Sequence, residues 1–350
     1  MASPNALTLI KDDLLQDADL SNADLAGTKF TGIRFKNVRF NQANLEQVDF
    51  TGCDFDQCDL SGANLTQAVL QGATLNACLL VECQLEKASC STISITKTDL
   101  GGATANEADF SAASFNQCIL DNTTLQSADL NCASLTNCSL GATRLQGANL
   151  QRFMVLESDL ATVQFGNNNL TQAMFMKANL AGQSFPECDF TLTLFIEADL
   201  QGANLAGSTL SQTQFTEACL KGANLSQVSA ENSNFSMTDL TAADLTSSHF
   251  SICEFSYAKL TQVRATGSRW HVTPLVGVDA SRAVFDGATL ELCDMSHASL
   301  DETSIRNATL NVCNLHQLSE KKTIWDGTTF NDTLRTDPVR QKAENWQPPV

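Results

Sequence analysis

The sequence predicts an all-β solenoid in which the chain winds into stacked four-sided coils from residue 15 to residue 330. Three observations predict this fold: a five-residue hydrophobic repeat without insertions, glycine at one fixed position of the repeat, and phenylalanine that recurs every 20 residues. Self-similarity at a fixed period is typical of solenoids, in which each coil contacts only its neighbours.

The five-residue repeat is visible at every residue number that is a multiple of five. From Leu15 to Phe330 there are 64 such positions, and 52 of them are Leu or Phe. Small residues stand two positions earlier and Asp or Asn often lies between, as in Ala148-Asn149-Leu150. A period of five fits neither the 3.6 residues of a helix nor the 2 residues of a strand. The chain must therefore turn at each repeat, with the large and the small residue pointing inward.

Glycine marks the corners of this structure. Of the 18 glycines, 15 lie two residues after the Leu or Phe position. The third residue of a type II turn needs a positive φ, which glycine adopts without steric cost. We therefore expect a tight turn after each Leu or Phe.

Phenylalanine sets the number of sides in a coil. It recurs every 20 residues in one stretch, at Phe175, Phe195, Phe215, Phe235 and Phe255. Residues that stack above one another should be equivalent, so 20 residues, or four sides, complete one coil. Residues 15–330 then form about 16 coils, and at a strand spacing of about 4.8 Å the rod is roughly 75 Å long.

The motif of a small residue, Asp or Asn, Leu or Phe, and two variable residues resembles that of the pentapeptide-repeat family. The resemblance covers residues 15–330 of the 350. It implies a right-handed quadrilateral β-helix, and the right-handedness follows from the resemblance alone.

The two ends of the chain lie outside the repeat. Residues 1–14 are predicted to form an N-terminal cap, because Ser3-Pro4 is typical of a helix N-cap followed by proline at the first helical position. Residues 331–350 are predicted to form either a C-terminal cap or a docking tail. Capping is the favoured role, since an uncovered β-helix end exposes strand edges that invite aggregation.

The motifs of common enzymes are missing from the sequence. There is no nucleotide-binding fingerprint, no zinc-ligand spacing and no nucleophile elbow, and the four histidines form no paired ligand motif. A tube filled by its own Leu and Phe leaves no concave pocket. We therefore expect no catalytic residue, no metal and no cofactor, and a protein that is not an enzyme.

The outer surface carries the candidate binding residues. Outward acidic residues form a stripe, the Val263–Ala280 segment is irregular, and one tryptophan lies in the tail. Trp270 in that segment has two interpretations: part of a bulged recognition patch or, as favoured here, a filler of space left by small neighbours. The candidate partner-binding residues are Glu157, Asp159, Glu197, Asp199, Glu217, Asp239, Arg264, Arg269, Trp270, His271 and Trp346.

These features favour a rigid protein-interaction scaffold or adaptor. The net charge of −18 opposes direct binding to nucleic acid or anionic membranes and favours a protein partner with a basic surface. No apolar run is long enough for a membrane helix, so a cytoplasmic bacterial location is expected, with export by a dedicated secretion system left open. A homodimer through one end is also left open.

Two finer functions follow from resemblances. The tail Leu334-Arg335-Thr336-Asp337-Pro338, together with Trp346, resembles the ends of pentapeptide proteins associated with bacterial type VI secretion, which implies an accessory role there. The alternative is a DNA mimic that protects DNA gyrase and topoisomerase IV, as in quinolone-resistance pentapeptide proteins. Duplex DNA carries one charge per about 1.7 Å, so a roughly 75 Å rod would need about 45 negative charges. The net charge of −18 is well short of that.

Overall fold

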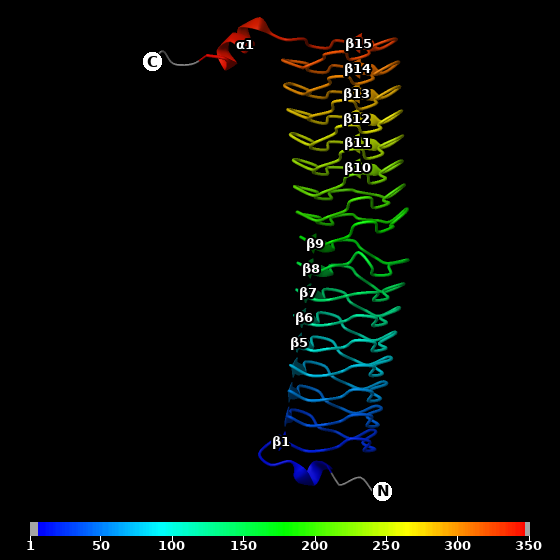
Figure 1. Ribbon diagram of the computed structural model, residues 1–350, viewed down its shortest axis with the longest axis vertical. Coiled ribbons are helices and arrows are strands. Elements are labelled where there is room, and N and C mark those ends of the chain that lie inside the picture. The colour runs from blue at the N-terminus through cyan, green and yellow to red at the C-terminus, as the bar shows by residue number, and fades with distance from the viewer. Residues whose placement is uncertain (1–5, 347–350) are drawn as a thin grey trace. The chain divides into compact units, whose positions relative to one another are not determined.

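The computed structural model describes residues 6–346 and consists of two units, residues 1–179 and residues 180–350. Each unit is a stack of coils whose short strands pair in parallel (Figure 1). The first unit contains a nine-stranded sheet and the second unit a six-stranded sheet. Together the two units hold about 16 turns of a β-solenoid, as the sequence predicts.

The secondary structure consists almost entirely of three-residue strands. The first unit begins with a 3-10 turn, η1 (Ala6–Leu9), and its strands are β1 (Leu14–Gln16), β2 (Arg34–Lys36), β3 (Asp54–Asp56), β4 (Thr74–Asn76), β5 (Ser94–Thr96), β6 (Ser114–Asn116), β7 (Ser134–Thr136), β8 (Met154–Leu156) and β9 (Met174–Met176). The second unit contains β10 (Ser229–Glu231), β11 (His249–Ser251), β12 (Arg269–His271), β13 (Thr289–Glu291), β14 (Thr309–Asn311), β15 (Thr329–Asn331) and the helix α1 (Pro338–Glu344). Among the described residues, no helix is long and apolar enough to cross a membrane.

The register between neighbouring strands confirms the 20-residue coil. Phe35 pairs with Phe55 in the first unit, and Phe250 pairs with Trp270 in the second. Backbone hydrogen bonds continue between strands and corners, as where the Leu60 N–H donates to the Leu79 carbonyl at 2.7 Å. A paired residue of a coil therefore lies next to the residues 20 positions earlier and 20 positions later in the sequence.

The corners adopt the left-handed backbone conformation that the glycines predict. At one of them the Ala23 N–H donates to the Leu20 carbonyl at 3.1 Å, and Asn22 has a φ of 58°. Gly52, at an equivalent position, has a φ of 64°. Most corners hold other residues in the same conformation, because hydrogen bonds to the next coil fix it, as from the Asn22 N–H to the Asn41 carbonyl at 2.9 Å.

Polar residues of the repeat satisfy the turns. Asp59 precedes a corner, and its Oδ1 accepts the Ser61 N–H at 3.0 Å, which is the local bond that favours Asp and Asn in turns. Buried cysteines act as small core residues. The Cys53 Sγ donates to the Phe30 carbonyl at 2.8 Å, and burial raises the pKa of this thiol to about 11. All 13 cysteines are free thiols.

The core consists of the inward Leu and Phe side chains. In the second unit Phe195, Phe215, Phe235 and Phe255 form a stack, with ring centroids 5.0, 4.8 and 4.5 Å apart. All four side chains are fully buried. The inward direction and the 20-residue recurrence of Phe are therefore confirmed.

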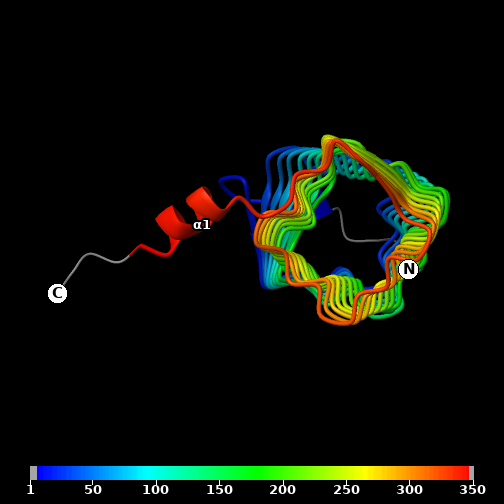
Figure 2. The ribbon, with the colours of Figure 1, turned by 90° about the horizontal axis from the view of Figure 1, so that it is seen from above.

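The two chain ends differ in how their core is covered. In the first coil Leu15 and Leu20 are buried, and the preceding segment forms η1, whereas Ser3 and Pro4 lie outside the described residues. In the last coil Phe330 is 38% exposed and Leu334 is 66% exposed. Helix α1 lies beside the coils of the second unit and not over them (Figure 2). Whether residues 331–350 act as a cap or as a docking tail stays a prediction from the sequence.

We predict that Phe215→Ala lowers the free energy of unfolding by about 3–5 kcal/mol, because it opens a cavity between stacked rings. Tyr257→Ala is the matched control, since Tyr257 is 66% exposed and its loss should change stability by less than about 0.5 kcal/mol. Urea unfolding followed by circular dichroism measures both. Equal stability of the Phe215 variant and the parent would contradict the packing described here.

Candidate binding surfaces

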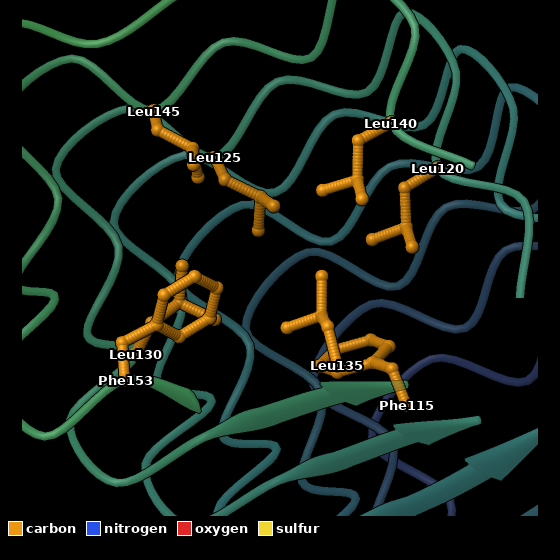
Figure 3. Close-up of a pocket in the computed structure, with 8 residues that line it drawn as sticks. All are labelled: Phe115, Leu120, Leu125, Leu130, Leu135, Leu140, Leu145 and Phe153. Carbon is orange, nitrogen blue, oxygen red and sulfur yellow. The ribbon is translucent and has the colours of Figure 1, made fainter. Parts of the chain in front are cut away.

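The interior offers no room for a ligand in the first unit. Its cavity has about 10 Å³ of space for water-sized spheres and is closed by leucine and phenylalanine side chains that point toward one another (Figure 3). An apolar space of this size stays dry. The residues that line it are Phe115, Leu120, Leu125, Leu130, Leu135, Leu140, Leu145 and Phe153. This cavity of the first unit is therefore too small for a ligand.

Trp270, predicted among the surface candidates, is instead a core residue that is 1% exposed. Its ring lies 4.5 Å from that of Phe250, and its Nε1–H donates to the Ser268 Oγ at 2.8 Å. The ring also packs against Phe255 and Phe285, so Trp270 fills space in the core, as the favoured interpretation of the sequence predicts. No partner can reach the indole, so the recognition-patch interpretation is wrong for this residue.

The charged neighbours of Trp270 do face outward. Arg269 is exposed on β12, and Arg264 Nη2 lies 2.6 Å from Asp244 Oδ2. His271 Nδ1 lies 3.3 Å from Glu291 Oε2 on the adjacent strand. The irregular segment thus presents Arg269 near the Arg264–Asp244 ion pair and the His271–Glu291 contact.

The predicted acidic stripe has members in both units, so each part is described separately. Glu157 and Asp159 are exposed in the first unit. In the second unit Glu197 and Glu217 are exposed, whereas Asp199 is half-buried and its Oδ1 accepts the Gln201 N–H at 2.9 Å.

Asp239 is partly neutralised by two lysines. Its Oδ2 lies 3.4 Å from Lys221 Nζ and 3.5 Å from Lys259 Nζ. Burial raises the pKa of Asp239, but hydrogen bonds from Thr241 and the charge of Lys221 outweigh it, so the pKa lies below its usual value. The acidic side chains of the second unit therefore do not form an unbroken negative row.

A row of exposed aliphatic side chains was not predicted from the sequence. We name it the apolar ladder; it consists of Ile252, Val272, Leu292 and Val312, which are 52%, 38%, 47% and 52% exposed. Each follows a strand by one residue, and the corners are hydrogen-bonded in sequence, with the Ile252 N–H donating to the His271 carbonyl at 2.9 Å. The members therefore lie in successive coils on one corner of the second unit.

The apolar ladder is conformationally unfavourable. The φ values of Ile252, Val272, Leu292 and Val312 are 55°, 48°, 53° and 51°. A positive φ is a real outlier for a β-branched residue, and the left-handed conformation costs about 1–2 kcal/mol per residue. Gly52, a multiple of 20 residues earlier, shows the residue type that this corner favours. Neither backbone preference nor core burial accounts for the apolar ladder.

The tail supplies a second exposed apolar group. Trp346 and Val339 are 67% and 79% exposed, and with Lys342 and Ala343 they line an open hollow of about 440 Å³ on α1. The helix begins at Asp337, whose carboxylate accepts the Val339 and Arg340 N–H groups. Trp346 is thus accessible, and its role in binding a partner stays a prediction.

We predict that Val272→Asn leaves the free energy of unfolding unchanged or raises it by up to about 1 kcal/mol, because asparagine tolerates a positive φ better than valine. Val284→Asn is the matched control on a half-buried bridge residue outside the left-handed corners, where the same change should destabilise. Chemical denaturation measures both variants. A loss at Val272 as large as that at Val284 would mean that the apolar ladder is needed for folding.

Two solved structures to which the chain is similar are those of pentapeptide repeat proteins from other sources. HetL, a pentapeptide repeat protein involved in heterocyst differentiation regulation in the cyanobacterium Nostoc, is 22% identical over 60% of this chain and 86% of its own, with a TM-score of 0.37. Full-length QnrB1, a plasmid-mediated fluoroquinolone resistance protein, is 18% identical over 63% of this chain and 94% of its own, with a TM-score of 0.27. No curated protein matches the chain.

The family model described as "Pentapeptide repeats" matches residues 18–57, 58–89, 93–131, 118–153, 173–212, 210–246 and 281–317. These matches cover most of both units. The chain belongs to the pentapeptide-repeat family.

Proposed function

We propose that this protein is a non-enzymatic interaction scaffold that binds a protein partner through the second unit, with the apolar ladder at the centre of the contact. The observation that carries the proposal is that Ile252, Val272, Leu292 and Val312 are exposed in corners whose conformation disfavours them. Contiguous apolar groups on a surface mark interaction sites. Residues that fold stability does not require can be retained for binding.

The surroundings of the apolar ladder have the composition of an interface. The centre is aliphatic, and the adjacent strands present polar and charged groups, among them Arg269 and the His271–Glu291 pair. Protein interfaces combine an apolar centre with a polar rim, and arginine is enriched in them. The coils hold these groups in fixed positions, which reduces the entropy lost on binding.

The filled interior supports a binding role over catalysis. Active sites are usually concave pockets of several hundred cubic ångströms, lined by apolar groups and a few converging polar groups. The core cavity of the first unit has only about 10 Å³ of space and is closed by apolar side chains. The regular outer faces instead offer a long repeated surface, which suits protein contact.

The apolar ladder suggests that the partner presents a strip of apolar side chains. The sequence also favours a basic partner, which Glu197, Asp199 and Glu217 would attract. We predict that reversing these three charges to lysine weakens capture of a basic partner, because opposite potentials become like potentials. Affinity at low and at high salt measures the effect. Unchanged affinity at low salt would exclude the acidic residues from the contact.

DNA mimicry is less well supported than scaffolding. A mimic of duplex DNA needs closely spaced negative charge along its surface. In the second unit Asp244 is paired with Arg264, Asp239 lies between two lysines, and Glu302 is paired with Arg282. These positive groups break up the negative potential. A role beside type VI secretion and a cytoplasmic location stay predictions that rest on the sequence.

The scaffold proposal is tested with a triple variant, Ile252→Asn, Val272→Asn and Val312→Asn. We expect it to fold like the parent and to lose most of its partner capture, because polar side chains replace the apolar centre. Parent and variant serve as bait in parallel, and captured proteins are compared by quantitative mass spectrometry. A protein depleted with the variant is then purified, and its affinity is measured by calorimetry.

Leu79→Asn with Ile119→Asn is the control variant. These aliphatic residues are 44% and 42% exposed in the first unit, but Asp99 separates them, so they form no continuous row. The control should capture the partner as the parent does. Equal capture by the triple variant and the parent would refute the apolar ladder as the binding site.

A further inference from the structure

Two histidines and a carboxylate converge where α1 meets the coils of the second unit. His297 and His316 are 19 residues apart, one short of a full coil, and the His297 N–H donates to the His316 carbonyl at 2.9 Å. Their rings meet edge to face with centroids 5.6 Å apart. Glu344, the last residue of α1, completes the group, and the ligand atoms of all three residues lie within 4.8 Å of one another.

The separations of these atoms match a metal centre closely. Glu344 Oε2 lies 3.0 Å from His316 Nε2 and 3.6 Å from His297 Nε2. A tetrahedral zinc ion with bonds of about 2.0–2.1 Å places its ligand atoms roughly 3.3 Å apart. The two distances from Glu344 Oε2 to the histidine nitrogens lie on either side of that value. The two histidine nitrogens lie within 4.8 Å of each other and would have to move closer together to bind one ion.

The chemistry of the group suits zinc. Two imidazole nitrogens and one carboxylate oxygen form a known three-residue zinc donor set that leaves one coordination position open. Imidazole also favours zinc over calcium and magnesium, which prefer oxygen ligands. We propose that His297, His316 and Glu344 bind a zinc ion that fastens α1 to the coils of the second unit. This inference does not depend on the scaffold function.

Neighbouring groups position the carboxylate for this role. Arg340 Nε donates to Glu344 Oε1 at 2.7 Å, which holds that oxygen and leaves Oε2 facing the histidines. Gln317 Nε2 donates to Glu344 Oε2 at 2.6 Å and lies 3.4 Å from His316 Nε2. A rotation of this amide would turn its oxygen toward the ion as a fourth ligand.

The proton on His316 couples zinc binding to the start of α1. His316 is 2% exposed, and its Nδ1 accepts the Asp337 N–H at 3.1 Å, so the neutral ring carries its proton on Nε2. Zinc binding at Nε2 moves that proton to Nδ1, where it faces the Asp337 N–H. The bond to Asp337 must then break, so zinc binding should shift the backbone before α1.

Zinc titration of the untagged, full-length, reduced chain tests the site, with binding measured by calorimetry. We expect one ion per chain, and an affinity reduced by roughly tenfold or more in His297→Gln and in Glu344→Gln, because each removes one ligand. Both residues are partly exposed, so neither change should unfold the protein. Cobalt in place of zinc should give the visible absorption of a tetrahedral ion.

Three control variants separate this site from other zinc ligands. His249→Ala and His271→Ala remove histidines on β11 and β12, and Cys132→Ser removes the one exposed thiol among the described residues. All three should keep the parent affinity. Hydrogen exchange supplies a second measurement: zinc should slow amide exchange in α1 of the parent and not in Glu344→Gln. No saturable binding, or equal losses in the control variants, would overturn the proposal.

Discussion

The hydrogen bonds between successive coils are the constraint on which the rest of this structure depends. Each coil donates to and accepts from its neighbours, as at Asp59, whose N–H donates to the Val38 carbonyl, and Leu60, whose N–H donates to the Leu79 carbonyl. These bonds require a constant 20 residues per coil, and the chain meets that requirement only by turning every five. The stacked phenylalanines, the left-handed corners and the columns of surface side chains all follow from this register.

The fold could be predicted from the sequence because inward positions obey simple rules. Phe215 and its equivalents report the coil length directly, and glycines such as Gly52 report the corner conformation. At Trp270 the position in the repeat indicated the core, and the favoured interpretation, a filler of core space, agrees with its burial, whereas the alternative of a bulged recognition patch does not. Whether a large ring fits in the core depends on the sizes of several neighbouring side chains together, so it cannot be read from Trp270 alone.

The surface was harder to predict, because outward side chains are subject to weaker rules. The apolar ladder has a sequence signal, an aliphatic residue every 20 positions from Ile252 to Val312. That signal can be recognised only when the coil length is known and the aliphatic residues are compared with the glycines that equivalent corners favour. The His297, His316 and Glu344 group gave no motif, because short zinc motifs describe helices and loops. Here two successive coils and a terminal helix bring the residues together, and no short spacing motif describes that geometry.

At the left-handed corners the backbone conformation does not depend on the type of residue. Gly52, Asn22 and Ile252 share one conformation, because the next coil holds the corner whatever its residue type. The side chains of equivalent corner residues in successive coils therefore lie in a row, at intervals of about 4.8 Å. A point substitution can change which partner such a row of side chains recognises without moving the backbone. A one-residue insertion would instead shift the register of every later coil. New specificity can therefore arise through exchange of side chains or of whole 20-residue blocks, with the architecture left intact.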